Sequence, residues 1–307
     1  MGRLKIWLKA IRAPFLTATI IPIALGAVIS WAEVNIFHWG YFWLTLAGGM
    51  FIHIGVNLSN DYFDHLSRND WNNQTPTPFS GGSRVIQNGA IKPYQILLAA
   101  LISFALGSLI GLYFNHILPG NIILYIGIAG IFLGFFYTGL PIKIGYRGLG
   151  LGELATGLGF GPLMVMGSYY VQTGHLGLIP FLASVPIALL IALVLYINEF
   201  PDYEADKSVN KKTLPVVLGK ERAAYLFYGL LLSTYFYTLI LVILGLMPIF
   251  ALITLLTFPL AVKIIRITTA HKDKAYELIP ANASTIMVHL TFGTGLIIAY
   301  LIDGLLF

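Results

Sequence analysis

Nine long runs of apolar residues occupy most of this 307-residue sequence. Because an α-helix rises about 1.5 Å per residue, roughly 20 apolar residues are needed to cross a hydrocarbon core about 30 Å thick. The runs have about this length and lack the alternating pattern of barrel strands. We expect transmembrane helices at residues 14–32, 39–60, 93–114, 119–138, 151–171, 177–199, 223–245, 247–265 and 282–302. The sequence therefore predicts an all-α membrane protein in which residues 1–307 form a single transmembrane domain, a bundle of nine helices.

Charged residues are scarce in this chain. They make up 10% of the sequence, against roughly 25% in soluble proteins, which excludes a soluble, disordered or coiled-coil protein and a nucleic-acid partner. The chain also has no cysteine. Disulfides, thiolate metal sites and cysteine nucleophiles are therefore excluded.

The basic residues predict the orientation of the bundle. If the nine helices alternate in direction, all 18 lysines and arginines lie on one side of the membrane. They are confined to residues 1–13, 61–92, 139–150, 200–222 and 263–281. Loops rich in lysine and arginine stay in the cytoplasm. We therefore expect a multi-pass protein of the cell membrane with a cytoplasmic N-terminus and, because most acidic residues lie on the same side, an active site that faces the cytoplasm.

Two acidic motifs with similar spacing end the second and sixth expected helices. They are Asn57-x-x-x-Asp61-x-x-Asp64 and Asn198-x-x-x-Asp202-x-x-x-Asp206. Residues three or four apart share one face of an α-helix, so we expect each motif to form a polar stripe where its helix reaches the cytoplasmic surface. One such cluster is ordinary at the end of a helix. Two matched clusters at the same level of the membrane predict a shared, central cavity open to the cytoplasmic face.

Carboxylates embedded in a membrane are costly and usually face a partner or an aqueous cavity. If the two motifs converge, the repulsion between their carboxylates must be offset by cations. Mg²⁺ is a hard cation that proteins bind through one or two carboxylates together with substrate phosphates. The pattern therefore indicates a magnesium site.

Basic side chains on the same face are candidates for binding an anion. Lys143 and Arg147 lie in a tight loop rich in glycine and proline, and Arg84 follows Ser80-Gly-Gly-Ser83. Glycines let backbone N–H groups approach an anion closely. Carboxylates that hold Mg²⁺ and basic residues that hold phosphoryl oxygens together suit a metal-bridged diphosphate.

Other basic residues have a simpler interpretation. Residues 3–12 form a basic amphipathic stretch that we expect to anchor to anionic lipid headgroups, although Arg12, close to Pro14 and the first span, has the alternative of facing the site. Lys211 and Lys212 follow the second acidic motif, and we expect them to contact lipid headgroups and to enforce topology, although with Lys207 they have the alternative of joining the basic residues around the diphosphate.

These motifs resemble the UbiA-type superfamily of intramembrane prenyltransferases over nearly the whole chain. The specific markers are Asn57-x-x-Asn60-Asp61-x-x-Asp64 and Asn198-x-x-x-Asp202-x-x-x-Asp206. Further segments are most similar to the 1,4-dihydroxy-2-naphthoate, or menaquinone-type, branch: Ser80-Gly-Gly-Ser-x-Val-Ile, Tyr146-Arg147-Gly-x-Gly and Gly167-Ser-Tyr-Tyr-Val-Gln-Thr-Gly174. One departure is Arg68, where many relatives have a third aspartate; Asp70 is the nearest substitute.

The resemblance implies Mg²⁺-dependent transfer of an isoprenyl chain from a prenyl diphosphate to an aromatic or lipid-like acceptor. It implies two Mg²⁺ ions, one held by Asp61 and Asp64 and the other by Asp202 and Asp206. Asn57 and Asn198 would assist in metal binding. The diphosphate would be contacted by Lys143, Arg147, Arg84 and Tyr137. The prenyl tail would lie between helices or extend into membrane lipid.

Two alternatives remain open at the level of sequence. The same chemistry on 4-hydroxybenzoate or on a glycerol phosphate lipid would need the same motifs. An ion-coupled transporter would also need intramembrane acids, but its site typically lies near the bilayer midplane at broken helices. Here the carboxylates are predicted at the cytoplasmic helix ends beside basic loops, which favours an enzyme.

Overall fold

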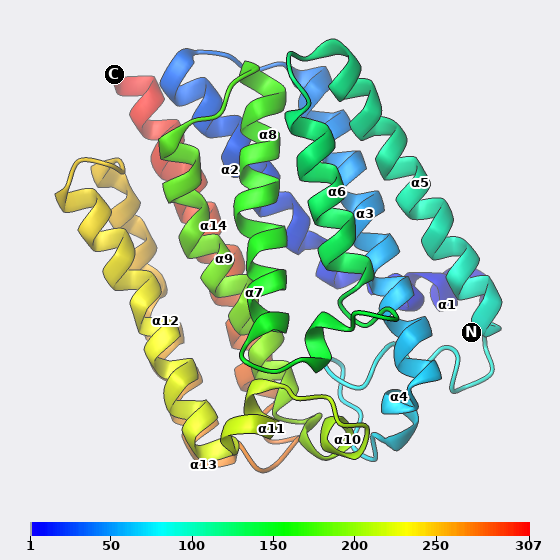
Figure 1. Cartoon of the computed structure of the whole chain (residues 1–307). Coiled ribbons are helices and arrows are strands. Elements are labelled where there is room, and N and C mark those ends of the chain that lie inside the picture. The colour runs from blue at the N-terminus through cyan, green and yellow to red at the C-terminus, as the bar shows by residue number, and fades with distance from the viewer. Residues whose placement is uncertain (1) are drawn as a thin grey trace.

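All regular secondary structure in the computed structural model, which describes residues 2–307, is helical (Figure 1). The first half contains α1 (Arg3–Ala10), α2 (Thr17–Val34), α3 (Trp39–Leu66), α4 (Asn69–Asn72), α5 (Pro93–Ile117) and α6 (Ile122–Phe135). The second half contains α7 (Leu151–Leu158), α8 (Met164–Thr173), α9 (Leu178–Glu199), α10 (Tyr203–Ser208), α11 (Leu214–Leu218), α12 (Lys220–Ile243), α13 (Phe258–His271) and α14 (Ile279–Leu306). The all-α prediction is therefore confirmed for the described residues.

Seven helical segments within residues 2–307 are long and apolar enough to cross a membrane. They are Ala13–Val34, Trp39–Leu66, Pro93–Ile117, Leu178–Glu199, Lys220–Ile243, Ile249–His271 and Ile279–Leu306. The other two expected spans differ from these. One forms α6, which has only 14 residues, and the other is divided into α7 and α8 by a π-helical turn, Gly159–Leu163, that contains Pro162. The number nine stays a prediction.

The largest core lies among α2, α8, α9, α12, α13 and α14 (Figure 1). Leu25, Ile187 and Phe292 are fully buried there. Small residues let these helices approach closely: a Cβ on Gly26 would collide with the Val165 carbonyl of α8. Such contacts are typical of helix packing in membranes, where van der Waals complementarity replaces the hydrophobic effect.

Short helices gather at one end of the bundle (Figure 1). α4, α10 and α11 lie at the lower end in this view, with α1 on the same side, whereas the C-terminus lies at the opposite end. α4 packs on α10, although more than 130 residues separate them in the chain. This contact brings the segment that follows the first acidic motif against the second.

Candidate active site

A cavity of about 340 Å³ enters the bundle beside these short helices. Its polar lining includes most of the predicted site residues: Arg12, Asn57, Asp64, Tyr137, Asn198, Asp202 and Asp206. Its apolar lining comes mainly from α3, α6, α9 and the π-helical turn Gly159–Leu163, with Ile52, Leu133 and Ile191 as examples. One continuous cavity therefore has a charged part and a hydrocarbon-like part.

Asp61 and Arg12 form the first charged contact of the site. Nη2 of Arg12 lies 2.5 Å from Oδ1 of Asp61, and the backbone N–H of Ser83 donates to the same oxygen at 3.3 Å. Asp61 is 2% exposed, and its Oδ2 has no hydrogen-bond partner. Burial alone would lower the pKa of Arg12, but the neighbouring Asp61 raises it overall. Arg12 therefore belongs to the site, as its alternative interpretation predicts.

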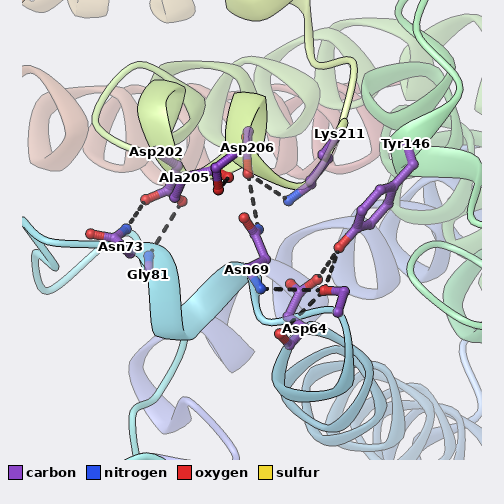
Figure 2. Close-up of polar contacts among 11 residues, drawn as sticks. Asp64, Asn69, Asn73, Gly81, Tyr146, Asp202, Ala205, Asp206 and Lys211 are labelled. Atoms are coloured by element: carbon purple, nitrogen blue, oxygen red, sulfur yellow. Dashed lines mark hydrogen bonds and ion pairs between the residues drawn. The ribbon is translucent and has the colours of Figure 1, made fainter.

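Asp64 is held by a tyrosine from the second half of the chain (Figure 2). The Tyr146 hydroxyl donates to Oδ1 of Asp64 at 2.9 Å and lies 2.8 Å from the hydroxyl of Ser67. Asp64 is buried. Burial and the Asp64 charge raise the pKa of Tyr146, so this hydroxyl keeps its proton and acts as a donor.

The second acidic motif is held by amides from the segment after α3 (Figure 2). Nδ2 of Asn69 donates to Asp206 Oδ1 at 2.9 Å, and Nδ2 of Asn73 donates to Asp202 Oδ1 at 2.6 Å. The Gly81 N–H donates to Asp202 Oδ2 at 3.3 Å. Lys211 adds a charge, with Nζ 3.4 Å from Oδ1 of Asp206. The two motifs are therefore joined by residues that lie between them in space.

Burial and mutual repulsion act on these carboxylates. Burial, followed by the charge of Asp206, raises the pKa of Asp202 to about 7. Burial also raises the pKa of Asp206, and Asp64 contributes in the same direction, although Lys211 opposes it. Asp64 and Asp206 are thus close enough to repel each other, which supports the predicted convergence of the two motifs.

One prediction about the backbone of the second motif is wrong. Asn198, Asp202 and Asp206 do not form a stripe on one helix, because α9 ends at Glu199 and Asp202 precedes α10. The break occurs at Phe200 and Pro201, where proline lacks the N–H that would continue the helix. Asp61 and Asp64, by contrast, both lie within the continuous helix α3, as predicted.

The two asparagines of the motifs line the cavity but already have protein partners. Nδ2 of Asn57 donates to the Ile11 carbonyl at 3.1 Å. Oδ1 of Asn198 accepts a hydrogen bond of 2.7 Å from Nδ2 of Asn282. These contacts tie α3 to the N-terminal segment and α9 to α14.

Three predicted anion-binding residues do not line the cavity. Nζ of Lys143 lies 4.8 Å above the ring of Tyr146. The Arg147 Nε donates to the carbonyl of Ile142 at 2.8 Å, and Arg147 is exposed. Arg84 donates to the backbone carbonyl of Asp70. Arg84 therefore orders the loop near the acids, while Lys143 packs on the tyrosine that holds Asp64.

The oxygen atoms at this site are suitable ligands for a divalent metal ion. Buried oxygens of Asn60, Asp61, Asn69 and Asp206 have no hydrogen-bond partner, and oxygen ligands of this kind suit Mg²⁺. Within residues 2–307 no group of three or more His, Asp or Glu side chains is already gathered at ligand spacing. The carboxylates instead contact Arg12, Lys211, the two amides and Tyr146.

The sequence of the chain matches the model of the UbiA prenyltransferase family over residues 19–299. The chain belongs to the UbiA prenyltransferase family. Among its curated relatives, the 1,4-dihydroxy-2-naphthoate octaprenyltransferase of Bacillus subtilis (strain 168) is 29% identical, and the alignment covers 98% of this chain and 94% of the relative. The 2-carboxy-1,4-naphthoquinone phytyltransferase of Synechocystis is 30% identical, with 96% and 92% coverage.

The fold of this UbiA family member also matches solved structures. A UbiA homologue from Archaeoglobus fulgidus bound to DMAPP and Mg²⁺ superposes with a TM-score of 0.66, at 15% identity, over 95% of this chain and 98% of that one. At this identity the likeness concerns the fold alone.

Sequence reasoning missed several side chains around the two motifs. Lys211 lines the cavity and is 8% exposed, so it follows its alternative interpretation, as a basic residue around the cavity, and not the expected contact with lipid headgroups. Asn69, Asn73 and Tyr146 were not predicted to bind the aspartates. The available signal was proximity in sequence, because Asn69 and Asn73 follow the first motif and Lys211 follows the second. Their partners, however, lie across the bundle or on a separate helix.

Proposed function

We propose that this UbiA family member is a Mg²⁺-dependent prenyltransferase that moves an isoprenyl chain from a prenyl diphosphate to an aromatic acceptor. The acceptor we propose is 1,4-dihydroxy-2-naphthoate, in menaquinone biosynthesis. The relatives from Bacillus subtilis and Synechocystis, both named for transfer to naphthalene-derived acceptors, support this acceptor. The observation that carries the proposal is one cavity with aspartates and cations at one part and an apolar lining at the other.

The proposed metal site consists of the four motif aspartates. Asp61 and Asp64 would hold one Mg²⁺, and Asp202 and Asp206 would hold a second. The A. fulgidus homologue bound to DMAPP and Mg²⁺ supports a divalent metal. When bound, Mg²⁺ neutralises the diphosphate oxygens and stabilises the negative charge that develops on the leaving pyrophosphate.

The residues of the chain would bind and orient the two substrates. Among the described residues that line the cavity, Arg12 and Lys211 carry positive charge, so we assign them to the phosphoryl oxygens. Tyr137 lines the same region and would orient the diphosphate. The apolar wall would hold the prenyl chain away from water, and aromatic faces such as that of Phe160 would stabilise the allylic cation.

We propose that Lys143, Arg147 and Arg84 act indirectly. Lys143 contacts the ring of Tyr146, which holds Asp64. Arg84 contacts the backbone at Asp70. Their substitution would therefore change the shape of the site more than its affinity for a phosphate group.

An assay with defined substrates tests the proposed reaction. The purified protein is given labelled prenyl diphosphates of several lengths with 1,4-dihydroxy-2-naphthoate, 4-hydroxybenzoate or a glycerol phosphate lipid, with and without EDTA. We expect a prenylated naphthoate-derived product that disappears with EDTA and in Asp61→Ala and Asp202→Ala, with both variants still folded in detergent. Product from another acceptor alone would replace the proposed substrate, and full activity of either variant would remove the metal assignment.

We further propose that residues 1–307 form one transmembrane domain with nine spans, and that the acidic end faces the cytoplasm. The segregation of all 18 basic residues supports this orientation. Because the chain has no cysteine, single cysteines can report it. We expect Lys207→Cys to react with an impermeant maleimide only in inside-out vesicles, and Asn121→Cys only in right-side-out vesicles. The reverse pattern would overturn the orientation.

A further inference from the structure

Two buried glutamates in the cavity region have no role in the proposed metal and diphosphate chemistry. Glu153 lies in the first turn of α7, and Glu199 is the last residue of α9. They are 8% and 4% exposed. A carboxyl group withdrawn from water at a membrane interface is costly unless a partner compensates it. The two glutamates therefore require a partner that compensates for their burial.

The helices that carry the two side chains, α7 and α9, pack on each other. Even so, Oε1 of Glu153 and Oε2 of Glu199 are buried and have no hydrogen-bond partner. Glu199 lines the cavity directly. An unpaired buried acceptor that borders a substrate cavity indicates that a ligand supplies the missing donor.

The surroundings restrict the kind of ligand. A diphosphate offers only acceptor oxygens, so it cannot supply the missing donor. The proposed function already assigns the metal ions to the four motif aspartates, and this pair of glutamates lies outside that set. The remaining chemistry is a neutral hydrogen-bond donor such as a hydroxyl group.

We propose that Glu199, supported by Glu153, binds a ring hydroxyl group of the aromatic acceptor. This inference rests on the proposed function and extends it to an acceptor subsite. Tyr137 forms the adjacent wall: its ring and hydroxyl lie against the backbone at Gly145 and Gly152, where a Cβ would crowd them, and it lines the cavity together with Glu199. A flat aromatic acceptor can therefore lie beside Tyr137 with one hydroxyl directed at Glu199.

This contact has two consequences for the reaction. A hydrogen bond from a phenolic hydroxyl to the carboxyl group pairs a buried acceptor that is otherwise left unsatisfied, and it increases the electron density of the ring. A site built to bind a hydroxyl also discriminates strongly against an analogue that lacks it, because a buried polar group is then left unpaired. Glu199 is therefore expected to determine which ring is accepted and how it is oriented.

The test measures acceptor binding without donor or metal. Binding of 1,4-dihydroxy-2-naphthoate, 1-hydroxy-2-naphthoate and 4-hydroxy-2-naphthoate is followed anaerobically by quenching of tryptophan fluorescence. The wild type should lose affinity for at least one monohydroxy analogue by roughly 10- to 100-fold. Glu199→Gln should weaken binding of the dihydroxy compound about tenfold, and Glu199→Met, which has no hydrogen-bonding group of this strength, by up to about 100-fold. Both variants should lose the preference between analogues.

Controls separate this role from a structural one. Glu204→Gln removes an exposed acid of α10 that does not line the cavity, and it should leave acceptor binding unchanged. Binding of a non-hydrolysable prenyl diphosphate analogue with Mg²⁺ should be equal in the wild type, Glu199→Gln and Glu153→Gln. In turnover assays, KM for the acceptor should rise while KM for the donor stays constant.

The outcomes distinguish this inference from the proposed function. If the acceptor binds through Glu199 but no prenyl transfer occurs, the subsite stands and the proposed function fails. If transfer occurs and Glu199→Gln keeps the wild-type preference between analogues, the subsite is wrong and the function stands. Equal loss of donor and acceptor binding would also overturn the inference. If Glu199→Met does not fold, the analogue series on the wild type and Glu153→Gln decides the question: equal affinity for all three compounds contradicts the subsite.

Discussion

The two aspartate motifs share a spacing in sequence but are built differently in the fold. Asp61 and Asp64 lie within the 28-residue helix α3, so regular helical geometry places them. Asp202 lies in the turn after α9, and Asp206 lies in the short helix α10. The first motif therefore depends on one long helix, and the second depends on a break between two helices.

The partners of the two motifs differ in the same way. Asp61 pairs with Arg12, which lies just before the first span. Asp202 and Asp206 accept hydrogen bonds from Asn73 and Asn69, which come from the segment that follows α3 (Figure 2). The less regular motif is thus held in place by a segment attached to the more regular one. Equal spacing in sequence does not imply equal support.

Substitution of one aspartate in each motif should have the largest effect, and it tests whether the two motifs are functionally equal despite this difference. Asp64→Asn and Asp206→Asn should each lower the rate of prenyl transfer by about 10³-fold at saturating Mg²⁺, because each removes negative charge from a metal site. Turnover of a labelled prenyl diphosphate measures this. Asp273→Asn, an exposed acid on the same face, is the control. A loss confined to one motif would show that only one of them holds an essential ion.

A smaller effect is expected at the cation of the second motif. Lys211→Met leaves Asp206 buried without its charged partner, so turnover should fall about 100-fold and the temperature of thermal aggregation should drop. The neighbouring Lys212 is exposed, and Lys212→Met should behave as the wild type. Wild-type activity in Lys211→Met would contradict our assignment of this lysine to the phosphoryl group.

Acidity should affect the second motif through Asp202. Its pKa is raised to about 7, chiefly by burial, so protons compete with Mg²⁺ below that pH. The apparent affinity for Mg²⁺ should therefore fall by up to about tenfold for each pH unit below 7. Above pH 7 the affinity should be nearly constant. Calorimetric titration of Mg²⁺ between pH 5.5 and 8.5, an interval of about three units around the raised pKa, measures this. In Asp202→Asn the remaining dependence should flatten, and an unchanged slope would exclude Asp202 as the titrating group.

The smallest effect concerns the amides that join the motifs. Asn69→Ala and Asn73→Ala each remove one hydrogen bond to an aspartate. Turnover should therefore fall about tenfold, and the Mg²⁺ concentration that gives half-maximal activity should rise. Asn72→Ala is the matched control, because the side chain of Asn72 donates to Ser208 and not to an aspartate. If the three variants are indistinguishable, the joining segment does not position the second motif.

Much of the site was predictable because it depends on local pattern. The aspartates, Arg12 and Tyr137 were identified from spacing, from position at helix ends and from resemblance to a family. Lys211 has two open interpretations at the level of sequence, and Asn69, Asn73, Tyr146 and Glu153 are not singled out. Each of these depends on a contact between segments that are distant in the chain or separated by a turn. A single sequence carries no record of such contacts.

The sequence by itself determined that this chain forms apolar helices in a membrane and carries two acidic motifs at their polar ends. The physical reason is that length, hydropathy and helical period are properties of contiguous residues. Only the tertiary structure decided which donors hold each carboxylate, that α9 ends before Asp202, and that the helix of Glu153 packs on the helix of Glu199. These features follow from the packing of α4 on α10 and of α7 on α9, and packing depends on the shapes of surfaces that no single segment contains.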